Sequence, residues 1–233
     1  MLRNELNERS PLRLFESSTR GGLGTGNIGV VVARAGLGKT AFLVDVALDD
    51  ALRGRKVLHV ALRQPVERVR EYYDEIFLDL ARTSGLDDVG AERLEMERNR
   101  HIYTFTGKAF SVERLRDTVA FLRDHAQFTP AAVIIDDYEF ETATLEDMQE
   151  LRALAGSMQA EFWMSAVTHR ESARDARGIP EPVAHLEAAV SVVVAMAHDG
   201  QSVMVRLLKD HDNPNVSGLS LALNPTTMLL MKN

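Results

Sequence analysis

The stretch from Ile28 to Thr40, IGVVVARAGLGKT, decides the fold. Its first six residues, Ile28–Ala33, are apolar and rich in β-branched side chains, which predicts a short buried strand. A turn with two glycines follows. The next segment, Lys39–Leu52, is rich in apolar residues and is closed by Arg53 and Gly54, which predicts a helix. The stretch is therefore a strand, a glycine turn and a helix in direct succession.

The turn fits the phosphate-binding pattern G-x-x-x-x-G-K-[ST], except that Ala33 replaces the first glycine. Backbone N–H groups in such a loop, continued by a helix N-terminus, point at phosphate oxygens. Lys39 supplies positive charge to the β- and γ-phosphates, and Thr40 offers a hydroxyl to Mg²⁺. The predicted nucleotide-binding residues of the loop are Arg34, Ala35, Gly36, Leu37, Gly38, Lys39, Thr40 and Ala41.

A second apolar run, residues 131–136, ends in the acidic pair Asp136 and Asp137 about 100 residues after the loop. An aspartate at the end of an apolar strand is the expected partner of a phosphate loop, because it holds Mg²⁺ directly or through water. We predict Asp136 as this residue, with Asp137 as a neighbour that could share the role. Lys39 and Asp136 are thus the predicted catalytic residues, and Thr40 and Asp136 the predicted Mg²⁺ ligands.

The rest of the chain predicts an α/β fold with a mostly parallel central sheet flanked by helices. Strands at 56–62, 101–106, 131–136 and 161–167 alternate with helices that begin at Pro65, Ser111 and Leu145. Four later runs, at 191–197, 202–209, 218–223 and 227–231, are separated by short turns, which predicts antiparallel hairpins. Residues 83–100 give no clear pattern. We expect one domain over 21–233, preceded by a polar extension at 1–20.

The amino-acid composition excludes several classes of functional site and of protein. The chain has 233 residues and no cysteine, which excludes disulfides, thiolate metal sites and cysteine nucleophiles. Its formal net charge of −7 argues against binding nucleic acid through overall charge, although a local basic loop can suffice. No apolar stretch reaches the roughly 20 residues that span a bilayer, and the charged N-terminus lacks the apolar core of a signal peptide. We expect a cytoplasmic protein without a membrane anchor.

With both motifs placed, the chain resembles the RecA-like P-loop ATPases, in the branch of DnaB-type replicative helicases and KaiC-type clock ATPases. The resemblance implies a RecA-like core that binds ATP and Mg²⁺ between the subunits of a homo-oligomer. Thr168-His169 resembles a γ-phosphate sensor of that family, so His169 joins the predicted nucleotide-binding residues. The matching segments are the glycine-rich lead-in at 20–26, the loop and GKTAF at 33–42, and 186–190, 209, 213–214 and 221–225 near the C-terminus.

The chain departs from this family at the position of the catalytic base. The family carries a glutamate after the second strand, and Arg63 stands in its place within Ala61-Leu62-Arg63-Gln64. An arginine stays protonated and cannot act as a base. Arg63 could instead bind a phosphate, which places it among the predicted nucleotide-binding residues, or pair with Asp136. Alternative bases are Glu67 one helical turn on, then Glu139 and Glu141, and an alignment shifted by one residue would bring in Gln64.

A second departure lies in the late hairpin, where the family sends a basic pair to a neighbouring subunit's γ-phosphate. The segment here is Lys209-Asp210-His211, with histidine where an arginine is expected. Losing an arginine finger costs on the order of 10³-fold or more in rate. Both departures predict an ATP-binding module for regulation or assembly, with weak or absent hydrolysis.

Two other functions stay open. The family resemblance also fits an active ATPase on single-stranded DNA, which would use the loop that carries Arg170, Arg174 and Arg177. Glu171 and Asp175 alternate with these arginines, which favours a solvated charged loop. A small-molecule P-loop kinase is the third option, and it would need an arginine-rich lid. His59, inside a predicted strand, is interpreted as a packed histidine.

Overall fold

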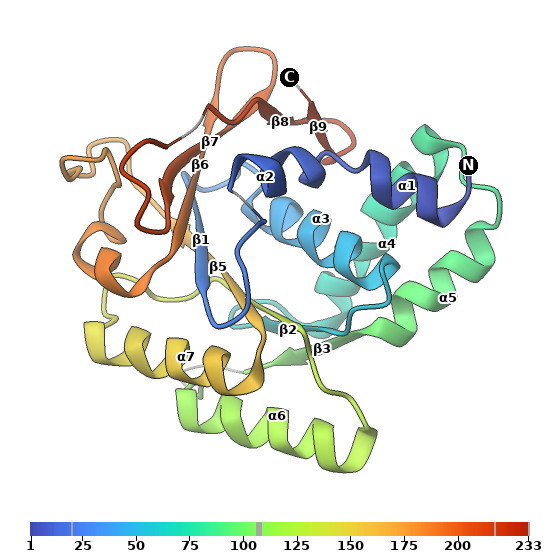
Figure 1. Ribbon diagram of the computed structural model, residues 1–233, viewed down its shortest axis with the longest axis horizontal. Helices are drawn as coiled ribbons and strands as arrows, with labels where there is room; N and C mark the ends of the chain where they lie inside the picture. Colours follow the sequence, from blue (N-terminus) through green and yellow to red (C-terminus); the bar gives the residue numbers. More distant parts are fainter. Residues whose placement is uncertain (20, 106–108, 217, 233) are drawn as a thin grey trace.

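A computed structural model describes residues 1–19, 21–105, 109–216 and 218–232 (Figure 1). Within them, one sheet has the strand order β3-β2-β4-β5-β1-β6-β7-β8-β9. The strands are β1 (Ile28–Ala33), β2 (Val57–Ala61), β3 (Arg100–Thr104), β4 (Ala132–Asp136), β5 (Glu161–Val167), β6 (Val192–His198), β7 (Val203–Asp210), β8 (Leu221–Leu223) and β9 (Leu230–Lys232). The helices are α1 (Arg3–Arg9), α2 (Leu12–Ser18), α3 (Lys39–Leu52), α4 (Val66–Ser84), α5 (Val89–Asn99), α6 (Val112–Ala126), α7 (Leu145–Met158) and the 3₁₀ helix η1 (Ala184–Ala189).

The strands from β3 to β6 in this order pair in parallel, and β7, β8 and β9 continue the sheet with antiparallel pairs. Parallel strands need long crossovers, which the helices supply, whereas the antiparallel strands β6 and β7 are joined by the short turn 199–202. The predicted α/β fold, with a mostly parallel sheet, flanking helices and C-terminal antiparallel strands, is confirmed. None of the helices in the described part of the chain is long and apolar enough to cross a bilayer.

Two hydrophobic cores lie on the two faces of the sheet, because successive side chains of a strand point to opposite sides. In β1, Val31 packs with α3 and α4, whereas Val30 and Val32 pack with α6 and α7. Figure 1 shows α6 and α7 side by side on their face of the sheet. All six residues of β1 are buried, which explains why its sequence is a continuous apolar run.

Residues 1–19 differ from the polar extension that we expected over 1–20, whose last residue lies outside the described part of the chain. They form α1 and α2, and Leu6, Leu12 and Phe15 from these helices are buried in the core above α3. The Phe15 ring lies 5.6 Å from the ring of Trp163 on β5. Each helix is only seven residues long, so too few apolar positions recur for a helical period to stand out.

A buried polar pair lies beneath α4. The Nδ1 atom of His59 on β2 is 3.0 Å from the Tyr73 hydroxyl, and the Arg100 guanidinium stacks over the Tyr73 ring. Burial, with a smaller contribution from the nearby Arg100 charge, lowers the pKa of His59 to about 3. His59 is therefore a neutral packed histidine in the folded protein, as its position in an apolar strand predicted.

This pair predicts an acid-sensitive part of the stability. The His59 pKa is depressed in the folded state, so the unfolded chain takes up the proton first. Stability is lost as the pH falls from about 6.5 towards 3, by up to about 1.4 kcal/mol per pH unit. Replacing both partners by apolar groups, His59→Leu with Tyr73→Phe, should flatten this part of a curve of unfolding free energy against pH. The exposed His185→Gln should leave the slope unchanged, and an unaltered slope in the double variant would contradict the assignment.

Candidate phosphate-binding site

The loop between β1 and α3, which the sequence predicts to bind phosphate, turns sharply at two glycines. Gly36 and Gly38 have positive φ angles of 78° and 85°, which side-chain-bearing residues rarely adopt. Gly38 is the N-cap of α3, so the open N–H groups of the first helical turn follow it directly. Arg34 and Ala35 are exposed at the loop tip, whereas Lys39 is buried.

The two predicted Mg²⁺ ligands meet across the sheet. Thr40 Oγ1 donates a hydrogen bond of 2.7 Å to Asp136 Oδ2. Strands β1 and β4 are not neighbours, because β5 lies between them. Helix α3 therefore crosses β5 and brings its first turn to the carboxyl end of β4. Residues 96 positions apart in the chain are in contact at one point.

Ser165 on β5 completes this contact, and sequence reasoning missed it. Its hydroxyl donates to Asp136 Oδ1 at 2.5 Å and accepts the backbone N–H of Asp137 at 2.9 Å. Both carboxylate oxygens of Asp136 are thereby held, one by Thr40 and one by Ser165. A lone serine inside the apolar strand Phe162–Val167 was the available signal, since a buried hydroxyl needs a hydrogen-bond partner.

The chemistry of these groups fits Mg²⁺. The ion prefers oxygen ligands and usually takes one or two from the protein, with the rest from phosphates and water. Thr40 and Asp136 supply two such oxygens beside the phosphate loop. In the residues that the structure describes, no group of three or more His, Cys, Asp or Glu side chains could hold a metal by itself.

Lys39 lies over the loop with its charge unpaired by a carboxylate. Its Nζ donates to the Arg34 carbonyl at 3.4 Å, and burial lowers the pKa of the ammonium. The charges of Asp136 and Asp137 act in the opposite direction and raise it. A phosphate in the cradle would give this ammonium a direct anionic partner.

Asp137 has a different environment from Asp136. Its backbone has a φ of 62°, a conformation that is uncommon outside glycine. Burial raises the pKa of its carboxyl group and Asp136 adds to this, while Gln64, Arg63 and Lys39 lower it. The Asp137 side chain thus faces the segment after β2 and stands between the phosphate loop and that segment.

The predicted residues after β2 do not join the Mg²⁺ pair. Arg63 Nη2 bonds Glu139 Oε1 at 3.2 Å, and both side chains are exposed. Among the described residues Arg63 forms its ion pair with Glu139 and none with Asp136, and its role in binding phosphate stays a prediction. Glu67 is exposed on the first turn of α4, and its side chain makes no ion pair in the described part of the chain. Its role as a base stays a prediction.

The predicted sensor pair, Thr168 and His169, follows the carboxyl end of β5, beside the end of β1. The Thr168 N–H donates to the Ala33 carbonyl at 3.0 Å, which places the end of β5 against the start of the phosphate loop. His169 is largely exposed, and its Nε2 is 3.8 Å from Glu141 Oε1. Contact between His169 and a nucleotide stays a prediction.

The basic residues of the late hairpin are bound within their own chain. Lys209 is buried, and its Nζ donates to the Glu187 carbonyl at 2.7 Å. The His211 ring lies between Asp210 and the Leu23 carbonyl, with Nδ1 2.9 Å from Asp210 Oδ1 and Nε2 2.9 Å from that carbonyl. Neither side chain points away from the subunit as a finger would.

A cleft of about 1130 Å³ opens beside Asp137, at the carboxyl ends of β2, β3 and β4. Phe105, Phe110 and Tyr138 line it, and consecutive rings pack edge to face at 5.4 and 5.8 Å. Burial raises the pKa of Tyr138 to about 12. Ligands of open α/β sheets bind at this end of the strands, so the cleft continues the same functional edge as the phosphate loop.

The two loop glycines should respond differently to alanine. Both substitutions force a left-handed alanine, which costs about 1–2 kcal/mol. A Cβ at Gly36 meets open space, whereas one at Gly38 would lie 2.5 Å from Leu223 Cδ2. We expect Gly38→Ala to lower the unfolding free energy by about 1–3 kcal/mol more than Gly36→Ala. Denaturant unfolding measures both, and the excess should shrink in a Leu223→Val background. Equal losses for the two variants would contradict the described loop packing.

No known protein-family model matches the chain, and no curated protein is significantly similar to it in sequence. The RecA-like resemblance therefore stays a prediction from the residues.

Proposed function

We propose that the chain is a RecA-like domain that binds ATP with Mg²⁺ at the loop 34–41 and hydrolyses it slowly or not at all. The observation that carries the proposal is the 2.7 Å hydrogen bond between Thr40 and Asp136 beside the buried Lys39. A phosphate loop, its lysine, its hydroxyl and a strand-end aspartate meet at one point, which is the set of groups that P-loop ATPases use.

Each group has a distinct task in binding. The loop N–H groups and Lys39 would hold the phosphates, and Thr40 and Asp136 would hold Mg²⁺. Bound Mg²⁺ neutralises charge on the phosphates. Ser165 acts as a positioning residue, because its hydrogen bond fixes the orientation of the Asp136 carboxylate.

Slow hydrolysis is supported by the groups that surround this cradle. Attack on the γ-phosphate needs a residue that orients water and a cation that stabilises the developing charge. Arg63 stands in the place of the base and pairs with Glu139. Lys209 and His211 are held by Glu187, Asp210 and Leu23 of the same chain.

A regulatory or assembly role follows from binding without rapid turnover, with ATP between the subunits of a homo-oligomer. The alternative is a DNA-dependent ATPase that uses the arginine loop. Arg174 donates to the Gly178 carbonyl at 2.8 Å, and Arg177 pairs with Glu187 at 2.5 Å. Two of the three loop arginines are thus engaged within the protein, which favours the regulatory role over binding DNA.

Nucleotide binding is tested by removing the loop cation. Lys39→Ala should weaken Mg²⁺-ATP binding at least tenfold in isothermal titration calorimetry, because a charge-assisted phosphate contact is lost. Lys56→Ala is the matched control. Lys56 donates to the Gln127 carbonyl at the amino end of β2, so this variant should bind ATP normally. Equal affinity in both variants would overturn the proposal.

The rate of ATP hydrolysis tests the second part of the proposal, that ATP is hydrolysed slowly or not at all. We expect wild-type hydrolysis below roughly 0.1 per second, because a missing finger alone costs on the order of 10³-fold. Adding oligo-dT should not raise the rate. Phosphate release is measured on wild type and on Lys39→Ala. An ordinary rate that DNA stimulates and Lys39→Ala abolishes would favour the DNA-dependent ATPase instead.

A further inference from the structure

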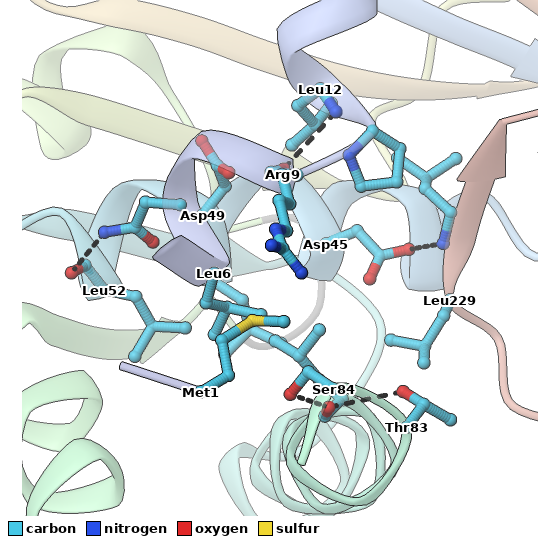
Figure 2. Close-up of a pocket in the computed structure, with 16 residues that line it drawn as sticks. Met1, Leu6, Arg9, Leu12, Asp45, Asp49, Leu52, Thr83, Ser84 and Leu229 are labelled. Carbon is cyan, nitrogen blue, oxygen red and sulfur yellow. Dashed lines mark hydrogen bonds between the residues drawn. The ribbon is translucent and has the colours of Figure 1, made fainter. Parts of the chain in front are cut away.

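A second pocket lies away from the phosphate loop, between α1, the α1–α2 turn, α3, α4 and the start of β9 (Figure 2). Its volume is about 210 Å³. At roughly 30 Å³ per water-sized group, it holds on the order of seven non-hydrogen atoms. Seven of its sixteen lining residues are leucines, from five different segments of the chain: Leu6, Leu12, Leu48, Leu52, Leu80, Leu229 and Leu230.

One carboxylate faces this apolar wall. Asp45, on α3, accepts the Leu230 N–H on Oδ2 at 3.0 Å, and Figure 2 shows its side chain directed into the pocket. Asp45 is partly exposed, and no described residue is found to donate a hydrogen bond to its other oxygen, Oδ1. Asp45 also forms no ion pair with any described residue. Burial raises the pKa of its carboxyl group well above the ordinary value.

Apart from Arg9, the other polar side chains in the wall form hydrogen bonds or ion pairs within the protein. Asn7 donates to the Leu52 carbonyl, Thr83 and Ser84 donate to carbonyls of α4, and the Ser10 hydroxyl accepts the Leu12 N–H. Asp49, about one helical turn after Asp45 on α3, forms ion pairs with Arg13 and Arg53. Asp45 Oδ1 is therefore the acceptor that the pocket offers to a ligand.

We propose that this pocket binds a small organic cation, with a primary ammonium at Asp45 and a short branched hydrocarbon stem among the leucines. A carboxylate that faces an apolar wall is partly screened from water, and an ammonium supplies both an opposite charge and a hydrogen-bond donor for it. The leucine wall gives an apolar stem favourable burial. Two sources share this chemistry, a free alkylamine and an amino acid with an apolar side chain.

Arg9 would distinguish between the two kinds of ligand, an alkylamine and an amino acid. Its side chain also lines the pocket, from α1, and it forms no ion pair within the described residues. The carboxylate of an amino acid would find a cationic partner there, whereas a simple amine would not use it.

This site is independent of the proposed function. Asp45 lies more than one helical turn beyond Lys39 and Thr40 on α3, and none of the pocket-lining residues belongs to the phosphate loop. Lys39→Ala should consequently keep its binding of the cation, so that failure at one site is distinguishable from failure at the other.

The test compares two ligands of equal shape by protein-observed NMR titration. 3-Methylbutylamine should bind the wild-type chain at least tenfold more tightly than 3-methylbutan-1-ol, which lacks the charge. Asp45→Asn should abolish this preference. Its amide oxygen still accepts the Leu230 N–H, and the variant loses a charge that faces an apolar wall, so thermal unfolding should occur at an equal or higher temperature. A loss of preference with an intact fold is what a ligand-binding carboxylate predicts.

The proposal is overturned if the amine does not bind, if the alcohol binds equally well, or if Asp45→Asn keeps the preference. L-Leucine distinguishes the sources in the same titration. Tighter binding of leucine than of the amine, with the excess lost in Arg9→Gln, supports an amino-acid ligand. Binding of the amine alone, unchanged in Arg9→Gln, supports an alkylamine.

Discussion

The hydrogen bond from Thr40 to Asp136 ties the first turn of α3 to the carboxyl end of β4. It depends on the strand order, because α3 must cross β5 to reach β4. The same crossing places Ser165 of β5 under Asp136 and buries Lys39 over the loop. The sheet topology thus gathers every group of the candidate cradle at one edge, where parallel α/β sheets generally bind ligands.

If the loop binds a nucleotide as we propose, the groups around it suit holding the nucleotide more than cleaving it. Binding needs fixed donors and cations, which the loop and Lys39 supply without help from another subunit. Cleavage also needs an activated water and a second cation at the γ-phosphate. Arg63, at the predicted position of the base, and Lys209 and His211, at that of the basic pair, are each engaged by a neighbour in the same chain. Glu67, the alternative base, is exposed and forms no ion pair with a described residue.

Much of the fold could be predicted, because buried parallel strands and the helices that cover them leave continuous or periodic apolar runs. The bounds of Lys39–Leu52 and Glu161–Val167 were predicted correctly for this reason. The short α1 and α2 bury few side chains and left no readable period. At the site, the motif spacing predicted Thr40 and Asp136 together. The pairing of Arg63 with Glu139 could not be predicted, since it joins loops from different strands and depends on their packing.

The central claim is that Thr40 and Asp136 form the protein side of a Mg²⁺-nucleotide site. A crystal structure with Mg²⁺ and a non-hydrolysable ATP analogue tests it most directly. We predict the phosphates in the loop 34–41, Lys39 on the β- and γ-phosphates, and Mg²⁺ between the Thr40 hydroxyl and Asp136. A nucleotide bound elsewhere, or an intact Thr40–Asp136 bond with no metal beside it, would contradict the claim.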